Sequence, residues 1–158
     1  MGNDEQIGFD IEFDDKTQAF LDWVAPERME SAIRAFLSTA VPNLGNESEW
    51  WKPPVSTHVL EAAVQLFGDW AGFTAPENWS LADGLVRFLG ECHIRRHPDS
   101  AWTNRPGWGA PRYTDIGPAV CVRGDSVQSV VSKAETLFRR NYGPDMVEYN
   151  IDMAHLPA

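Results

Sequence analysis

The sequence predicts an α+β fold in which about four helices surround a small antiparallel sheet of two or three strands. Three observations lead to this prediction. Apolar residues recur at three- and four-residue steps in several segments, as they do along one face of a helix. After Pro98 this spacing gives way to short apolar runs separated by prolines and glycines, which is typical of strands and turns. With 158 residues and 43% apolar composition, the chain is long enough for one domain with a sizeable core.

The N-terminal part is predicted to hold an acidic arm followed by two helices. Residues 1–15 form the arm, and the alternation of apolar and acidic residues at 8–13 fits either a docked edge strand or a flexible segment. Residues 17–24 fit a short helix. Pro26 suits the first turn of the next helix, because its missing N–H costs little there. That helix carries apolar residues at amphipathic spacing: Met29, Ile33, Phe36, Leu37 and Ala40.

Two adjacent tryptophans, Trp50 and Trp51, lie in a predicted loop at residues 47–54. Neighbouring side chains in a loop do not easily point into one core, and an exposed tryptophan is a common anchor at binding surfaces. The alternative is that both cover the core beneath the two prolines that follow. The next helix is predicted at residues 57–71, with Gly72 as its C-terminal cap.

A helix at residues 80–97 is predicted to lie at the centre of the domain. Ser80 and Asp83 have the spacing of a capping box. Pro98 ends the helix, because the proline ring cannot extend it. Its apolar face consists of Leu81, Leu85, Phe88, Leu89 and Cys92.

The remaining elements are predicted to be strands, a final helix and a tail. Residues 101–103 fit a first strand, and residues 113–122 fit a second strand that is interrupted at Gly117-Pro118, where proline suggests an edge or a bulge. Asp125 is the expected N-cap of the last helix. The globular domain is then residues 16–144, and residues 145–158 are an acidic tail.

The formal net charge of −10 is unevenly distributed. The first 30 residues contain nine acids against two bases, whereas residues 87–123 contain six arginines against three acids. Ten of the thirteen basic residues are arginine, which favours planar, bidentate pairing either with the chain's own acids or with a ligand. An acidic protein is a poor general binder of nucleic acid, because attraction to phosphate needs a basic surface.

The sequence provides little support for metal or cofactor chemistry. His93 and His97 would share a helix face, but Glu91 precedes both, whereas the zincin pattern places its glutamate between the two histidines. Cys92 and Cys121 are expected to be buried free thiols rather than ligands. We therefore expect neither a metal nor a cofactor.

Glu91 is the strongest candidate for an alternative ligand site. If the helix face that carries it is covered, its carboxylate needs a partner, for which Arg112 and Arg123 are candidates. A structural ion pair and a general base are both compatible with this position. A small-ligand enzyme or sensor would use Glu91, His93 and these arginines.

Several residues in the C-terminal half carry a resemblance to a group of bacterial domains. They are the Leu89-Gly90-Glu91 run, the Arg95-Arg96 pair, Trp102 and the run at residues 117–120 that leads to a helix. Residues 79–138 resemble small uncharacterised bacterial domains in which an L-G-E-x-x-x-R helix precedes a strand beginning at tryptophan. Such domains are similar to proteins found near toxin and secretion genes, some of which are suspected immunity proteins. The chain departs from the pattern at residues 97–100, where a glycine turn is usual.

The leading functional prediction is a non-enzymatic, cytoplasmic protein-binding module, most plausibly an immunity-type inhibitor that occludes a basic toxin. The acidic composition would accelerate association with such a partner. No membrane association is expected, because no apolar run approaches the ~18 residues that a membrane-spanning helix needs. The expected partner-binding residues are Asp10, Glu12, Asp14, Asp15, Trp50 and Trp51.

Overall fold

A computed structural model describes residues 15–45, 49–122, 126–139 and 142–153. The fold is α+β, as predicted, with a three-stranded antiparallel sheet and seven α-helices in the described part of the chain. Their order is a helix at residues 15–24, α2 (Pro26–Ala40), α3 (Val55–Phe67), α4 (Trp70–Thr74), the 3-10 turn η1 (Pro76–Asn78), α5 (Trp79–Arg96), β1 (Ala101–Asn104), β2 (Pro118–Cys121), β3 (Val127–Ser129), α6 (Val130–Leu137) and α7 (Pro144–Met153).

The prediction of about four helices was too low for two reasons. The helix expected at residues 57–71 ends at Gly68, which adopts a positive φ of 82°, and the chain restarts as the short helix α4. The side chain of Asp69 caps α4 by accepting a hydrogen bond from the backbone N–H of Gly72. The second reason is α7, which occupies residues that were assigned to a tail.

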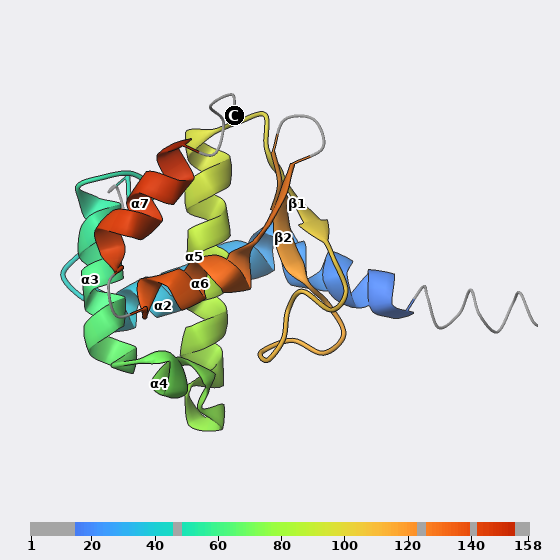
Figure 1. Cartoon of the computed structure of the whole chain (residues 1–158), viewed down its shortest axis with the longest axis horizontal. Helices are drawn as coiled ribbons and strands as arrows, with labels where there is room; N and C mark the ends of the chain where they lie inside the picture. Colours follow the sequence, from blue (N-terminus) through green and yellow to red (C-terminus); the bar gives the residue numbers. More distant parts are fainter. Residues whose placement is uncertain (1–14, 46–48, 123–125, 140–141, 154–158) are drawn as a thin grey trace, which may run out of the picture.

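Helix α5 is central, as the sequence predicted, and α2 and α6 cross it on opposite sides (Figure 1). Leu85, Phe88 and Leu89 are fully buried. Gly84 permits the close approach of α2, because a Cβ at this position would lie 2.5 Å from the Cβ of Phe36. The predicted capping box is wrong: α5 begins at Trp79, its N-cap Asn78 makes no side-chain capping bond, and Asp83 instead accepts hydrogen bonds from the core.

The sheet has the order β1-β2-β3, and it packs against α5 and α6. Pro118 is the first residue of the central strand, a position at which proline is tolerated. Residues 127–129, predicted to be helical, form β3 instead. Helix α6 therefore begins at Val130, where the Ser129 hydroxyl caps it by accepting from the N–H of Ser132. The expected N-cap, Asp125, lies outside the described residues.

Helix α7 corrects the prediction of an acidic tail at residues 145–158, of which residues 154–158 are not described. It packs against α3, α5 and α6 and buries Val147 and Ile151. Its Glu148 carboxylate forms an ion pair with Arg96 at 2.8 Å and accepts a hydrogen bond from Ser56 at 2.7 Å. One acid of this segment, Glu148, thus pairs with Arg96 of α5 inside the protein. Together with the buried Val147 and Ile151, this contact makes the segment part of the core.

Two further predictions concern the chain ends and the membrane. The predicted arm at residues 1–15 lies outside the described residues, except that residue 15 already belongs to the first described helix. Among the helices of the described ranges, none combines the length and the apolar character needed to cross a bilayer.

Candidate functional site

Four aromatic side chains form a continuous row between the start of α5 and strand β1. The ring of Trp79 lies 5.1 Å from that of Tyr113, which lies 5.9 Å from Trp23, which in turn lies 5.0 Å from Trp102. All three contacts are edge-to-face, a geometry that aromatic rings favour. The row joins two groups of charged residues that differ in how their charges are paired.

A half-buried carboxylate, that of Asp83, fixes the middle of this row. Asp83 accepts hydrogen bonds from the indole N–H of Trp23 at 2.9 Å, from the Tyr113 hydroxyl at 2.5 Å and from Arg87 Nε at 2.7 Å. Burial and the Asp83 carboxylate raise the pKa of Tyr113 well above its ordinary value. The Arg87 guanidinium is buried and also lies over the Trp23 ring. The rings of Trp23 and Tyr113 are therefore each held in one orientation.

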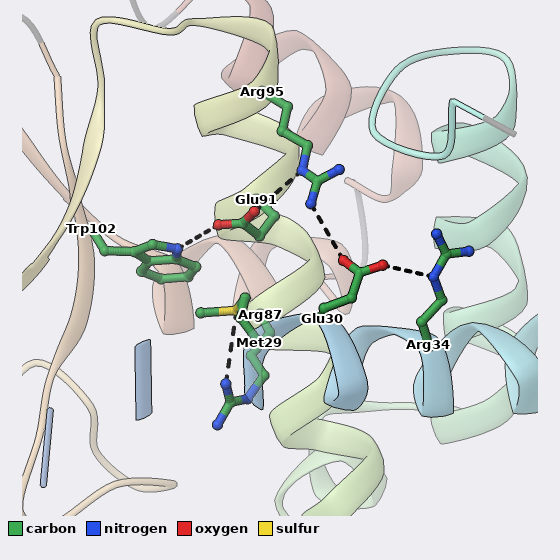
Figure 2. A network of polar contacts seen from close by, with 7 residues as sticks. All are labelled: Met29, Glu30, Arg34, Arg87, Glu91, Arg95 and Trp102. Carbon is green, nitrogen blue, oxygen red and sulfur yellow. Dashed lines mark hydrogen bonds and ion pairs between the residues drawn. The ribbon is translucent and has the colours of Figure 1, made fainter. Parts of the chain in front are cut away.

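At one end of the row lies a group that we call the Glu91–Trp102 cluster, formed by Glu30, Arg34, Glu91, Arg95 and Trp102 (Figure 2). Trp102 Nε1 donates to Glu91 Oε2 at 2.7 Å, and Arg95 Nε donates to Glu91 Oε1 at 3.2 Å. Arg95 also reaches Glu30 at 3.6 Å, and Glu30 pairs with Arg34 at 2.8 Å. Both oxygens of Glu91 thus accept hydrogen bonds from side chains of the protein.

Gly90 makes this cluster possible. A Cβ added at this position would lie 1.9 Å from the Trp102 ring, so only glycine lets the indole lie across α5. The run Gly90-Glu91 therefore supplies both the space for the Trp102 ring and the acceptor for its N–H.

The structure corrects the partners expected for Glu91. Arg95 and Trp102 take the carboxylate, whereas Arg112 lies elsewhere, against Trp79, and Arg123 is outside the described residues. A hollow of about 410 Å³ does open beside Glu91, with Glu30 and Arg95 in its lining. His93 is fully buried, its ring 5.2 Å from that of His97. Within the described ranges, no three His, Cys, Asp or Glu side chains gather where they could hold a metal ion.

The adjacent tryptophans cover the core, and this corrects the expectation of an anchor at Trp50. Trp50 is 1% exposed and packs on Phe88 with ring centroids 5.6 Å apart, while Trp51 is half-buried beside it. The guanidinium of Arg95 lies over both indoles, at 4.6 and 5.4 Å. Of the other residues expected to bind a partner, Asp15 is exposed at the start of the first helix, and Asp10, Glu12 and Asp14 are not described.

At the other end of the row is a cavity of about 380 Å³ that we call the Trp79 pocket. Its walls are aromatic, from Trp23, Trp79 and Tyr113, and four charged side chains also line it: Asp22, Arg28, Arg112 and Asp115. The Arg112 guanidinium lies 3.9 Å above the centre of the Trp79 ring, and its Nη1 donates to the carbonyl of Thr74 at 3.0 Å. Desolvation lowers the pKa of Arg112, and its buried Nε has no acceptor among the described groups.

The loop at residues 105–117 places three of these lining residues. Two hydrogen bonds of Gly117 close the loop at its base. Its carbonyl accepts from the backbone N–H of Arg105, and its own N–H donates to the side-chain oxygen of Asn104. A Cβ at Gly117 would lie 1.7 Å from the Arg105 carbonyl oxygen, so this closure requires glycine. Tyr113 N–H then donates to the carbonyl of Gly109 at 2.8 Å. The loop is therefore a packed turn that presents Arg112, Tyr113 and Asp115 toward α5.

The charges of the Trp79 pocket differ from most other charges in the molecule. Of the eight arginines in the described ranges, five form ion pairs with carboxylates: Arg34, Arg87, Arg95, Arg96 and Arg139. Arg28, Arg105 and Arg112 form none with a described carboxylate, and two of these three line the pocket. Asp22 and Asp115 are likewise free of ion pairs within the described part of the chain. Two cations and two anions thus meet in one cavity without neutralising each other.

Sequence reasoning missed this site because its residues come from three separate segments. The preference for arginine over lysine, and the loop rich in glycine and proline after Trp102, were the only signals that pointed toward it. Comparisons of the chain with family models, with curated proteins and with solved structures found no match.

Proposed function

We propose that this protein is a non-enzymatic protein-binding module, and specifically an immunity-type inhibitor that occludes a basic bacterial toxin. One observation carries the proposal. Leu21 is 52% exposed on the first described helix, and Asp15 and Asp22 are exposed on the same helix, where their seven-residue spacing puts the two carboxylates on one side. A helix that exposes both an apolar residue and carboxylates suits a basic surface that offers an apolar contact and positive charge.

The charge distribution supports the same partner. Nine of the 23 acids fall within the first 30 residues, the part of the sequence that also contains Leu21. A negative field raises the rate of association with a cationic protein, and salt weakens it. The resemblance of residues 79–138 to domains found near toxin genes points to the toxin class among basic partners.

The alternative of an enzyme or sensor that uses Glu91 and His93 has weaker support. Both oxygens of Glu91 already accept hydrogen bonds, so a substrate would compete with Trp102 and Arg95 for them. His93 is buried on a helix that packs on all sides, and it does not border the hollow beside Glu91. A ligand-binding role fits the Trp79 pocket better than this position.

The test is association kinetics with a partner found among the products of neighbouring genes. Asp15→Asn combined with Asp22→Asn should slow association several-fold at low salt and flatten its salt dependence, because these acids lie at the docking face. Leu21→Ser should instead speed dissociation, because it removes apolar contact area.

A matched control neutralises two acids on the other side of the molecule. Glu61 in α3 and Asp145 in α7 are exposed, and Figure 1 places these helices away from the helix at residues 15–24. Glu61→Gln with Asp145→Asn should leave the association rate close to that of the parent. Equal effects of the two pairs, or a partner whose toxicity persists in the complex, would refute the proposal.

A further inference from the structure

The geometry of the Trp79 pocket points to a second function: we propose that it binds a small zwitterion with a large apolar side chain, of the chemical class of a free aromatic amino acid. This proposal does not rest on the toxin-inhibitor proposal, because it requires no protein partner, although Asp22 contributes to both surfaces. It follows from three properties of the pocket: its walls, its arginines and its charge balance.

The walls suit an apolar, flat group. Trp23, Trp79 and Tyr113 line a cavity of about 380 Å³, which lies at the small end of the range for ligand sites. Asp83 holds Trp23 and Tyr113 from behind through hydrogen bonds of 2.9 and 2.5 Å. Because the rings are fixed before binding, little rotamer entropy is lost when a ligand ring packs on them.

The arginines suit a carboxylate. The guanidinium of Arg112 is stacked on Trp79 and anchored through Nη1 to the Thr74 carbonyl, which fixes the plane of its remaining donors. Its Nε is buried against the protein, so a ligand would reach this guanidinium through its Nη groups. Arg28 lines the same cavity without a described carboxylate partner. A ligand carboxylate would satisfy both arginines with charge-assisted hydrogen bonds.

The charge balance restricts the ligand further. Asp22 and Asp115 bring two negative charges to the cavity, so its four charged side chains sum to zero. A phosphate dianion would meet two carboxylates, and a simple amine would meet two guanidinium groups. A zwitterion offers one charge to each pair, so its carboxylate would face Arg28 and Arg112 and its ammonium would face Asp22 and Asp115.

Isothermal titration of the full chain with L-phenylalanine tests the proposal. We expect saturable binding in the micromolar to low millimolar range, on the order of a small ligand with few polar contacts. Two analogues separate the charges: 3-phenylpropionate lacks the ammonium and phenethylamine lacks the carboxylate. Each should bind at least about tenfold more weakly than L-phenylalanine, since each leaves one pair of protein charges without its ligand partner.

Variants assign the binding to this pocket. Arg112→Leu and Trp79→Ala should each weaken L-phenylalanine binding by about tenfold or more. Asp115→Asn, at an exposed position, should weaken binding of L-phenylalanine but leave that of 3-phenylpropionate unchanged. The matched control is Arg105→Leu, because Arg105 also lies over an indole, that of Trp108, and has no described ion pair, but does not line the pocket.

Two results with L-phenylalanine alone would overturn the proposal. One is the absence of heat and of any melting shift with L-phenylalanine up to about 10 mM, roughly the weakest affinity that a specific small-ligand site would show. The other is binding that Arg112→Leu, Trp79→Ala and Asp115→Asn all leave unchanged while each variant keeps the parent's melting curve. Equal affinity for 3-phenylpropionate and L-phenylalanine would also contradict it, because the ammonium would then have no partner.

Discussion

The Glu91–Trp102 cluster and the Trp79 pocket lie at the two ends of one row of aromatic rings, yet the charged side chains are paired in the cluster and unpaired in the pocket. In the cluster, Glu91 and Glu30 are shared between Arg95, Arg34 and Trp102, and every carboxylate oxygen drawn in Figure 2 has a hydrogen-bond or ion-pair partner. In the pocket, two arginines and two aspartates line one cavity without pairing. The side chains of the cluster therefore satisfy one another within the fold, whereas three of the four charged side chains of the pocket, those of Asp22, Arg28 and Asp115, are exposed to solvent, where our proposal places a ligand.

The two ends also differ in how they are built. The cluster joins α2, α5 and β1, all of them regular elements, and it depends on the small volume of Gly90. The pocket is formed by the first described helix, the start of α2, the start of α5 and the loop at residues 105–117. Binding residues are more often found on loops that a rigid scaffold positions, and the pocket fits that pattern.

The largest effect is expected at the carboxylate that supports the aromatic row. Asp83→Ala removes the acceptor for Trp23, Tyr113 and Arg87, and it leaves the buried Arg87 guanidinium without its ion pair. We expect a loss of about 3–5 kcal/mol in the free energy of unfolding, measured by urea denaturation. A loss below about 1 kcal/mol would show that the row does not depend on Asp83.

The next effect concerns the space that Gly90 provides. Gly90→Ala places a methyl group against the Trp102 ring, and we expect it to cost about 1–3 kcal/mol of stability through overpacking. The sign of the stability change shows whether the Trp102 ring occupies this space, because alanine at an open helix position would instead stabilise the protein by about 1 kcal/mol. Near-UV circular dichroism should report the displaced indole.

A smaller effect is expected from Lys133, a buried cation whose side chain donates to the amide oxygen of Gln128. Burial lowers its pKa from an ordinary value of 10.5 to about 8. Between about pH 8 and 10.5 the unfolded chain therefore binds more protons than the folded one, and stability rises with pH through this window. Lys133→Met should raise stability at pH 7 and remove the rise, as urea denaturation at several pH values would show. A slope unchanged by this substitution would contradict the account of Lys133.

Regular elements were predictable where one physical signal dominated. The spacing of apolar residues in 80–97 predicts one buried helix face, and Leu85, Phe88 and Leu89 on that face are fully buried. The capping box failed because Ser80 and Asp83 fit it by spacing alone, while two donors from distant segments, Trp23 and Tyr113, and a third one helical turn away bind the Asp83 carboxylate. Helix α7 was missed because its acids suggested a solvated tail, and the partner of Glu148 lies 52 positions earlier, at Arg96.

The candidate site was much less predictable than the fold. Glu91 was singled out correctly as a carboxylate in need of a partner, but the expected partners were wrong because Arg95, one helical turn away, and Trp102 satisfy it first. Trp50 was a candidate anchor because exposure cannot be read from two adjacent tryptophans. The Trp79 pocket combines residues more than 90 positions apart, and no local spacing brings such residues together.

The most direct test of this contrast compares two leucine substitutions by urea denaturation. Glu91→Leu leaves the Trp102 N–H and Arg95 without their acceptor, and we expect it to cost about 2–3 kcal/mol in unfolding free energy. Arg112→Leu removes one hydrogen bond, that from Nη1 to the Thr74 carbonyl, and a buried Nε that has no described acceptor, and it keeps an apolar contact with Trp79, so the change should stay within about 1 kcal/mol. An equal or larger loss for Arg112→Leu would show that the Trp79 pocket is part of the structural framework, and the contrast between the two regions would be wrong.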